Sequence, residues 1–352
     1  MRPSSRGSSI RARVVSIAAV VALLPFVASG VALADGPTTG PGLIDRATSA
    51  NGSYVEKVTV SDDKHLTIYV HSASMDQTFP IEVQRAADTS VPRPALYLLN
   101  GAGGGQDLAS WTAKSDAMQF LSSKNVNVVT PIGGMWSYYT DWKQRDPVLG
   151  LNKWKTFLTE ELPPIIDAGL GTNGKNSIAG LSTSGTTVLA LAEAAPGLYK
   201  SLASYSGCAQ TSDPIGQEFV RLTVETWGGG NILNMYGPPN DPMWAANDPY
   251  VHADKLRGVA MYISTGSGLP GPYDTLNDPH ALPGVYGLAN QVVIGGVIEA
   301  AVSHCTRHLQ SRLDELGIPA TYNFRNVGTH SWGYWQDALK DSWPVISAPL
   351  GI

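Results

Sequence analysis

Two segments near residue 60 alternate apolar and polar side chains. The first is Tyr54–Val60, the second is Leu66–His71, and Ser61-Asp62-Asp63 lies between them. Because successive side chains of a strand point to opposite faces, this alternation is typical of strands with one buried face. The short polar stretch supplies the turn. The pattern therefore predicts an antiparallel hairpin near residue 60.

Short, mostly apolar runs and helical patterns alternate along the rest of the chain. The runs that indicate strands are Ala95–Leu99, Val126–Thr130, Asn176–Ala179, Ser201–Ser206, Val259–Ile263 and Ala320–Phe324. The clearest helical patterns are Trp154–Leu162, Thr186–Glu193 and Ile294–Leu316. Strands that alternate with helices favour a mostly parallel sheet covered by helices on both faces. No repeat or linker interrupts residues 54–352, so we expect a single α/β domain there.

The first 34 residues have the layout of a signal peptide. Four arginines precede an uncharged run, Val14–Ala34, which ends in Ala32-Leu33-Ala34. A basic start, an apolar run and a small-x-small end predict export with cleavage after Ala34. A run of this length could also anchor a chain in a bilayer, but Pro25 and Gly30 interrupt it. Residues 35–53, rich in Gly, Pro, Thr and Ser, are expected to form a flexible leader.

Composition excludes several classes of protein. Of 352 residues, 43% are hydrophobic and 15% charged, which is not the composition of a disordered chain. Removal of residues 1–34 takes four arginines and no acid, leaving 20 basic and 29 acidic side chains and a net charge of −9. Nothing therefore favours a nucleic-acid partner. After cleavage the chain is expected to be soluble.

A candidate nucleophile follows the strand that begins at Asn176. The sequence Gly180-Leu181-Ser182-Thr183-Ser184-Gly185 predicts a tight turn between a strand and a helix, with the Ser182 hydroxyl lifted above the sheet. The G-x-S-x-G pattern fails at its last position, where Ser184 stands. An ordinary helix start, with Ser182 or Thr183 as a cap, is the alternative interpretation.

His330 is the best candidate for the base that a serine nucleophile needs. It lies in Gly328-Thr329-His330-Ser331-Trp332, after the last predicted strand, where α/β-hydrolases place their histidine. His304 and His308 have the i, i+4 spacing of a metal pair, but no third ligand stands near them, so no metal is expected. The other histidines, in less suitable positions, are His65, His71, His252 and His280.

The acid and the oxyanion hole are less well defined. Asp274, Asp278 and Glu299 all follow the strand at 259–263, and position alone favours Asp274. The glycine-rich stretch 101–105 lacks the third glycine of a dinucleotide fingerprint, and we expect no cofactor. A glycine loop after an early strand suits an oxyanion hole, with backbone N–H groups from Ala102 and Thr183.

Several sequence blocks are shared with one family. They are Ala95–Gly101, Tyr138–Trp142, Trp154–Pro163, Gly180–Ser182, Tyr236–Trp244, Asn247–Pro249 and Gly328–Trp335. In these blocks the chain resembles the antigen 85 mycolyltransferases, within the esterase D-like α/β-hydrolases. The resemblance implies an α/β-hydrolase fold and a Ser–Glu–His triad of Ser182, Glu299 and His330, which replaces Asp274 by Glu299 as the expected acid.

The resemblance also implies the substrates. The family moves a mycolyl group from trehalose monomycolate to a trehalose lipid or to cell-wall arabinan, and Asn100, Ser331 and Trp332 would contact substrate. Where the family has Asp-Gly-Leu-Arg, this chain has Asn100-Gly101-Ala102-Gly103, so a cationic sugar contact is missing.

Cys208 and Cys305 depart from the family pattern. A secreted setting permits a disulfide between them, which would hold the Glu299 helix to the sheet; two free thiols are the alternative.

We expect a monomeric enzyme that is secreted or held peripherally at the cell envelope and acts on lipid-linked sugars. A secreted carboxylesterase and a non-catalytic wall-binding relative are the alternatives.

Overall fold

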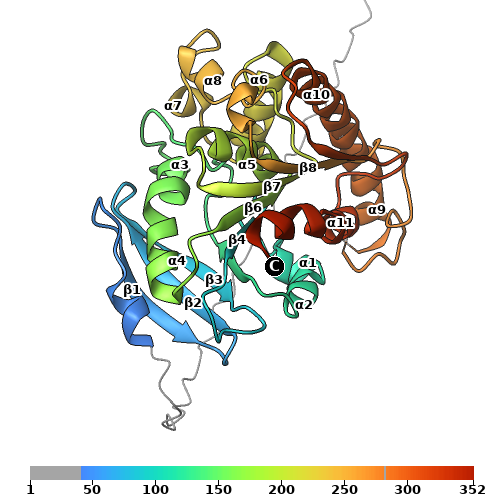
Figure 1. Cartoon of the computed structure of the whole chain (residues 1–352). Helices are drawn as coiled ribbons and strands as arrows, with labels where there is room; N and C mark the ends of the chain where they lie inside the picture. The colour runs from blue at the N-terminus through green and yellow to red at the C-terminus, as the bar shows by residue number, and fades with distance from the viewer. Residues whose placement is uncertain (1–40, 281–282) are drawn as a thin grey trace, which may run out of the picture. The chain divides into compact units, whose positions relative to one another are not determined.

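A nine-stranded sheet forms the centre of the chain, in the order β1-β2-β3-β5-β4-β6-β7-β8-β9 (Figure 1). This computed structural model describes residues 41–280 and 283–352, which pack as one unit. The signal peptide expected at residues 1–34, and residues 35–40 of the leader, lie outside the described residues. The strands are β1 Tyr54–Val60, β2 His65–Ser72, β3 Gln77–Gln84, β4 Ala95–Leu99, β5 Asn127–Pro131, β6 Asn176–Leu181, β7 Tyr199–Tyr205, β8 Ala260–Thr265 and β9 Thr321–Phe324.

Helices join most of these strands. The α-helices are α1 Trp111–Lys114, α2 Ala117–Leu121, α3 Trp154–Thr156, α4 Leu162–Leu170, α5 Thr183–Ala194, α6 Pro214–Arg221, α7 Ile232–Met235, α8 Pro242–Ala246, α9 Gly284–Asn290, α10 Gly296–Glu315 and α11 Trp332–Leu350. The 3₁₀-helices are η1 Pro41–Arg46 and η4 Ala253–Leu256, and the π-helical turns are η2 Phe157–Glu161, η3 Leu222–Trp227 and η5 Gln291–Gly295.

The sheet is parallel from β5 to β9 and antiparallel at the other end. This arrangement confirms the mostly parallel sheet with an N-terminal antiparallel part. The hairpin expected from the sequence gains a third strand, β3, which pairs with both β2 and β5. No strand was expected there, because a proline rarely stands inside a strand; β3 nevertheless continues through Pro80, with Phe79, Ile81 and Val83 buried at alternate positions.

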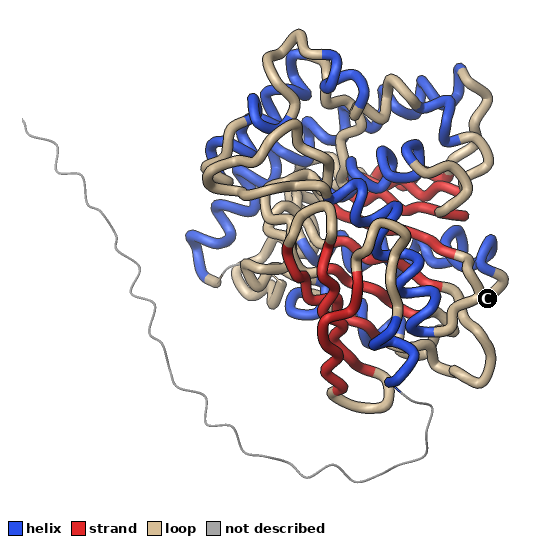
Figure 2. The backbone as a smooth tube through the Cα atoms, turned by 90° about the vertical axis from the view of Figure 1, so that its left-hand side faces the viewer, coloured by secondary structure: helices blue, strands red, loops and turns tan. Residues whose placement is uncertain are grey.

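Helices cover both faces of the sheet, as Figure 2 shows. Alternate residues of β4 separate the two layers: Tyr97 and Leu99 belong to the core beneath α4, α5 and α10, whereas Leu96 and Leu98 belong to the core beneath α1, α2 and α11. A strand buried on both faces needs apolar side chains at every position, which explains the unbroken apolar run at 95–99.

Residues 41–53 differ from the loose leader expected there. Ile44 in η1 is buried against α4, and Asn51 donates a hydrogen bond from Nδ2 to Glu161 Oε1 at 2.6 Å. Glu161 is itself buried and also accepts from the Ser72 hydroxyl. The segment is ordered because it supplies a partner to a buried carboxylate.

A buried carboxyl group near the end of α5 generates a prediction about stability. Glu193 is buried, its Oε1 has no hydrogen-bond partner within the described residues, and burial raises its pKa to about 9, with Asp248 adding to the rise and Lys255 opposing it. The folded chain therefore keeps a proton that the unfolded chain releases near pH 4.5. Between these two values the unfolded state binds fewer protons, so the free energy of unfolding falls as pH rises.

We expect Glu193→Gln to reduce this fall, as measured by urea unfolding at pH 5, 7 and 8.5. Glu315→Gln, at an exposed position, serves as the control and should keep the wild-type slope. If the free energy of unfolding changed equally with pH in wild type and in Glu193→Gln, Glu193 would not be the group responsible for the fall.

Candidate active site

Ser182 occupies the turn between β6 and α5. Its φ of 58° and ψ of −124° lie outside the regions that most residues adopt, and they separate the last strand residue, Leu181, from the first helical residue, Thr183. A serine held in this way is at the tip of a sharp strand-to-helix turn, as in the nucleophile turn of α/β-hydrolases.

The glycine that the motif lacked at position 184 is supplied one residue later. A Cβ on Gly185 would lie 2.8 Å from the Tyr205 carbonyl oxygen, so only glycine lets α5 approach the end of β7 this closely. Ser184 fits because its hydroxyl folds back onto its own turn, where it accepts from the Leu181 N–H at 2.9 Å. The change in the motif leaves the turn intact.

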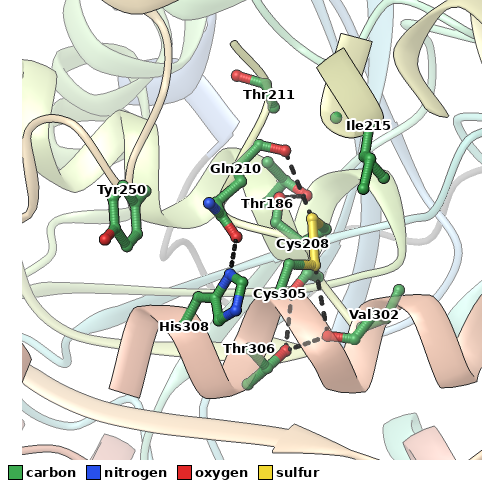
Figure 3. The surroundings of a disulfide bond; sticks show 12 residues. Thr186, Cys208, Gln210, Thr211, Ile215, Tyr250, Val302, Cys305, Thr306 and His308 are labelled. Carbon is green, nitrogen blue, oxygen red and sulfur yellow. Dashed lines mark hydrogen bonds between the residues drawn. A yellow bond between two sulfur atoms is a disulfide. The ribbon is translucent and has the colours of Figure 1, made fainter. Parts of the chain in front are cut away.

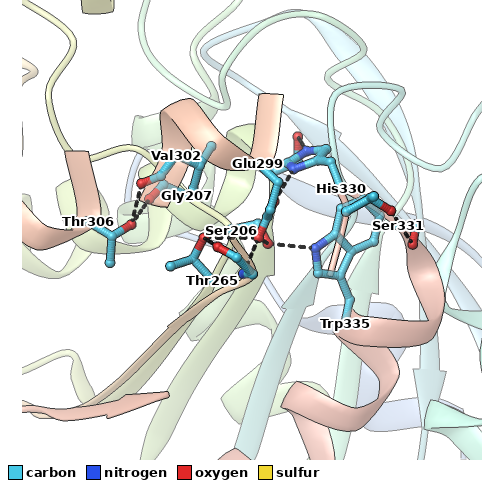
Figure 4. Close-up of polar contacts among 12 residues, drawn as sticks. Ser206, Gly207, Thr265, Glu299, Val302, Thr306, His330, Ser331 and Trp335 are labelled. Atoms are coloured by element: carbon cyan, nitrogen blue, oxygen red, sulfur yellow. Dashed lines mark hydrogen bonds and ion pairs between the residues drawn. The ribbon is translucent and has the colours of Figure 1, made fainter. Parts of the chain in front are cut away.

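His330 joins Ser182 to Glu299. Its Nε2 lies 2.8 Å from Ser182 Oγ and its Nδ1 lies 2.7 Å from Glu299 Oε2. The edge of the ring packs against Trp335, and the backbone N–H donates to the Gly295 carbonyl at 3.2 Å. Three segments far apart in the sequence thus meet in one hydrogen-bonded chain, of which Figure 4 shows the contact between Glu299 and His330. Such a chain can move a proton from a hydroxyl to an imidazole.

Glu299 is held by donors on both carboxylate oxygens. It is 1% exposed, and its Oε1 accepts from the Ser206 hydroxyl at 2.7 Å, the Thr265 hydroxyl at 3.0 Å and the Gly266 N–H at 2.6 Å. A buried carboxylate is costly unless it is fully hydrogen-bonded. These contacts, from the ends of β7 and β8, fix the carboxylate and with it the orientation of the imidazole.

Asp274, which position alone favoured as the acid, is not in contact with His330. Its carboxylate accepts from the hydroxyls of Thr329 at 2.5 Å and Tyr334 at 2.6 Å, and from the Gln291 side-chain amide at 2.8 Å. Asp274 therefore fastens the loop that carries His330. Asp278 accepts from the His280 N–H instead.

Ser206 and Trp335 were not singled out from the sequence. Trp335 Nε1 donates to Ser206 Oγ at 2.9 Å, and Ser206 in turn donates to Glu299 (Figure 4). Trp335 stands within the Gly328–Trp335 block, five residues after His330, which was the available signal. Ser206 directly follows a buried strand and has a φ of 51°. Nothing in the sequence distinguished it from the other serines of the chain.

Two cavities meet at His330. The first, of about 230 Å³, is lined by Ser182, His330 and apolar groups that include Trp136, Phe219 and Trp227. The second, of about 550 Å³, is also lined by His330 and mixes apolar and polar groups. Its lining includes Leu108, Lys114, Gln291, Ile294, Ser331 and Trp332. Ile298 borders both cavities.

The residues expected around the substrate fall into two groups. Ala102 and Thr183 line the first cavity, and Ser331 and Trp332 line the second. Thr183 begins α5, so its N–H has no acceptor within the helix. Asn100 differs from expectation because it is fully buried; its Oδ1 accepts from the Trp111 N–H at 3.0 Å and so anchors α1.

Cys208 and Cys305 form a disulfide, with a Cα–Cα distance of 5.4 Å (Figure 3). Cys208 follows β7 two residues after Ser206, and Cys305 lies on α10 six residues after Glu299. Cys208 also lines the first cavity. The bond therefore fastens the helix that carries Glu299 to the segment that carries one of its hydrogen-bond donors.

His304 and His308 pack edge to face, with ring centroids 4.2 Å apart, and His308 is hydrogen-bonded to Gln210. Across residues 41–280 and 283–352, no three acidic, histidine or cysteine side chains gather as a metal site would require.

The strand order, the turn at Ser182 and the position of His330 after the last strand define an α/β-hydrolase fold. Residues 72–345 match the family described as "Putative esterase". The chain is 31% identical over 293 residues to the diacylglycerol acyltransferase/mycolyltransferase Ag85A of Mycobacterium leprae, covering 81% of this chain and 83% of that protein. It is 30% identical over 292 residues to Ag85A of Mycobacterium ulcerans, covering 81% of each. The chain thus belongs to the esterase family and, within it, to the Ag85 mycolyltransferases.

Solved structures agree with this assignment. Mycobacterium tuberculosis MPT51 (FbpC1) superposes with a TM-score of 0.66 at 25% identity, over 82% of this chain and all of that one. An S-formylglutathione hydrolase of Agrobacterium tumefaciens superposes with a TM-score of 0.60 at 15% identity, over 84% of this chain and 99% of that one, which shows a shared fold alone.

Ser206 generates a prediction about positioning. We expect Ser206→Ala to lower kcat about tenfold and to leave KM nearly unchanged, because Glu299 and Trp335 each lose a buried partner while the cavities stay intact. Ser201→Ala, on the strand that precedes Ser206 but hydrogen-bonded to Ser177 and Ile346, is the control and should retain wild-type kcat. Equal losses in the two variants would indicate a general effect on folding.

The disulfide generates a prediction about stability. It closes a loop with a sequence separation of 97 residues, so its reduction should lower the free energy of unfolding by about 2–4 kcal/mol. Urea unfolding with and without dithiothreitol measures this difference. In a Cys208→Ser, Cys305→Ser double variant the reductant should have no effect. Two free thiols found by mass spectrometry in the purified, unreduced protein would contradict the pairing.

Proposed function

We propose that this chain is an exported mycolyltransferase. It would move a long acyl group from trehalose monomycolate to a hydroxyl of a trehalose lipid or of cell-wall arabinan, through an acyl-Ser182 intermediate. The observation that carries the proposal is the contact of His330 with both Ser182 and Glu299 at the wall of an apolar cavity. The printed activity of the Ag85A relatives supports the reaction class.

The first half of the reaction transfers the acyl group to the enzyme. His330 Nε2 takes the Ser182 proton while Oγ attacks the ester carbonyl carbon. When the tetrahedral intermediate collapses, the bond to the sugar oxygen breaks and His330 returns the proton to that oxygen. Glu299, hydrogen-bonded to Nδ1, stabilises the imidazolium that exists between these two steps.

The second half repeats the chemistry in reverse. A hydroxyl of the acceptor sugar gives its proton to His330 Nε2 and attacks the acyl-serine carbonyl. The bond between the carbonyl carbon and Ser182 Oγ breaks, and His330 returns the proton to the serine. Water in place of the sugar would turn the enzyme into a carboxylesterase.

Backbone N–H groups of Ala102 and Thr183 are the proposed donors to the negatively charged oxygen of each intermediate. Both residues border the cavity beside Ser182. The Ala102 carbonyl accepts from the Trp136 N–H at 2.6 Å, which restrains the loop that bears Ala102. Loss of one donor of this kind costs about 3 kcal/mol of transition-state stabilisation.

The two cavities suit the two parts of the substrate. The first, with Trp136, Phe219 and Trp227 in its wall, offers an apolar surface to an acyl chain and little to hold water. The second carries Lys114, Gln291 and Ser331 beside Trp332, a set that can bind sugar hydroxyls and pack against a sugar ring. Lys114 offers there the positive charge that is missing at Gly103.

Export is part of the proposal. It is supported by the charge and hydropathy layout of residues 1–34 and by a disulfide, which persists in an oxidising compartment. We propose that the mature chain acts as a monomer, secreted or held peripherally at the envelope.

The direct test is incubation with trehalose monomycolate. Wild type should produce trehalose dimycolate, and mass spectrometry of a quenched reaction should find the acyl group on Ser182. Ser182→Ala should lower the rate by about 10³-fold or more. Ser184→Ala, which keeps the nucleophile, is the matched serine control and should lose much less.

The products separate the alternatives. Free mycolate without dimycolate would identify a carboxylesterase. Full activity in Ser182→Ala would exclude the acyl-Ser182 intermediate for both the transferase and the carboxylesterase.

A further inference from the structure

The helix that carries Glu299 exposes apolar side chains on its outer side. Tyr286 is 80% exposed, Val293 58% and Val297 67%. They are spaced by seven and four residues and therefore lie on one face of the continuous helix formed by α9, η5 and the start of α10. With the exposed Ala289 and Ala300 they form what we call the outer stripe.

The outer stripe carries no charge. Residues 284–298 contain no Asp, Glu, Lys or Arg. The same face becomes polar further along α10, where His304, Arg307 and His308 are exposed. A water-facing helix surface is normally polar, so an apolar stretch that ends at a charged boundary indicates a surface that another phase or molecule covers.

The outer stripe is continuous with the catalytic cavities. Ile294, beside Val293, is itself exposed and lines the second cavity together with the exposed Leu108. One turn further, Ile298 borders both cavities next to His330. A donor that leaves an apolar phase at the stripe would therefore meet Ile294 and then Ile298, which borders the apolar cavity of Ser182.

The helix cannot cross a bilayer while the site is assembled. By length and composition, Gly284–Glu315 could span one. Its opposite face, however, holds Glu299 buried against His330, and Cys305 ties it to the loop after β7. Only the outer stripe is free, so the helix can lie along an apolar surface and not through it.

We propose that the outer stripe docks the enzyme on an uncharged lipid surface, from which the acyl donor enters the cavities. This inference rests on the proposed function, since it identifies where that reaction takes place. Charge favours a neutral surface over an anionic one: the stripe has no Lys or Arg to attract phosphates, and the chain has a net charge of −5.

Vesicle sedimentation tests the docking. Exported Ser182→Ala protein, cleaved after Ala34, is mixed with phosphatidylcholine vesicles. Its bound fraction is compared with that of a Tyr286→Ser, Val293→Ser, Val297→Ser variant in the same background. The stripe variant should bind at least about tenfold more weakly, because three apolar side chains no longer leave water. Raising the salt concentration should not weaken wild-type binding.

A matched control changes the same residue types elsewhere. Tyr54 and Val60, on the edge strand β1, are 44% and 61% exposed, and Val91, in the loop before β4, is 50% exposed. The helix α10 packs against β8, and β1 stands at the opposite end of the sheet from β8. Their replacement by Ser should leave vesicle binding unchanged. Circular dichroism and thermal unfolding should show all three proteins folded.

Three results would overturn the proposal. They are equal vesicle binding by the stripe and control variants, tighter and salt-sensitive binding to phosphatidylglycerol vesicles, and a concentration-dependent dimer that the stripe substitutions dissociate. Each points away from a neutral lipid surface, the last toward a second copy of this chain.

A soluble ester separates this inference from the proposed function. The stripe substitutions in an otherwise wild-type chain should leave hydrolysis of p-nitrophenyl acetate unchanged and lower transfer from vesicle-borne donor at least about tenfold. Loss of both activities would place the stripe in the catalytic site and overturn the docking role. Failure of Ser182→Ala to affect either activity would overturn the proposed function and leave the vesicle binding to stand by itself.

Discussion

The burial of the Glu299 carboxylate is the constraint on which the site depends. A carboxylate with 1% exposure needs donors on all sides, and here they come from the ends of two neighbouring strands and from an imidazole. The sheet must therefore bring β7 and β8 together, the disulfide must hold α10 over them, and the loop after β9 must present His330. A shift of any one of these elements would leave a buried polar group without a partner.

The sequence predicted those parts of the structure in which a local pattern of side chains is typical of one kind of element. The apolar run at 95–99 predicted a strand buried on both faces, and a small-residue stretch after a strand predicted the sharp turn at Ser182. It could not predict β3, because Pro80 hides the alternation of its buried residues, nor the ordering of residues 41–53, which depends on the partner that Asn51 supplies to the distant Glu161.

The acid shows why position in the chain was insufficient. Asp274 and Glu299 both follow β8, and both lie near the His330 loop in space. What distinguishes them is the donor that each carboxylate contacts, since Asp274 accepts from Thr329 and Tyr334 whereas Glu299 accepts from His330 itself. Only coordinates reveal which donor each one contacts. The family resemblance pointed to Glu299, whose carboxylate contacts His330, and also to Asn100, which is buried with its Oδ1 on the Trp111 N–H.

The meeting of two cavities at a single histidine has a consequence for inhibitor design. A compound with a tetrahedral phosphonate bound to Ser182, an alkyl arm in the cavity of Trp136 and Phe219, and a polyhydroxylated arm beside Trp332 would imitate donor and acceptor at once. Because the two arms are joined, binding of the first would make binding of the second intramolecular, and the second would lose less translational and rotational entropy. Selectivity over relatives would come from the sugar arm, because the cation available to it here is Lys114.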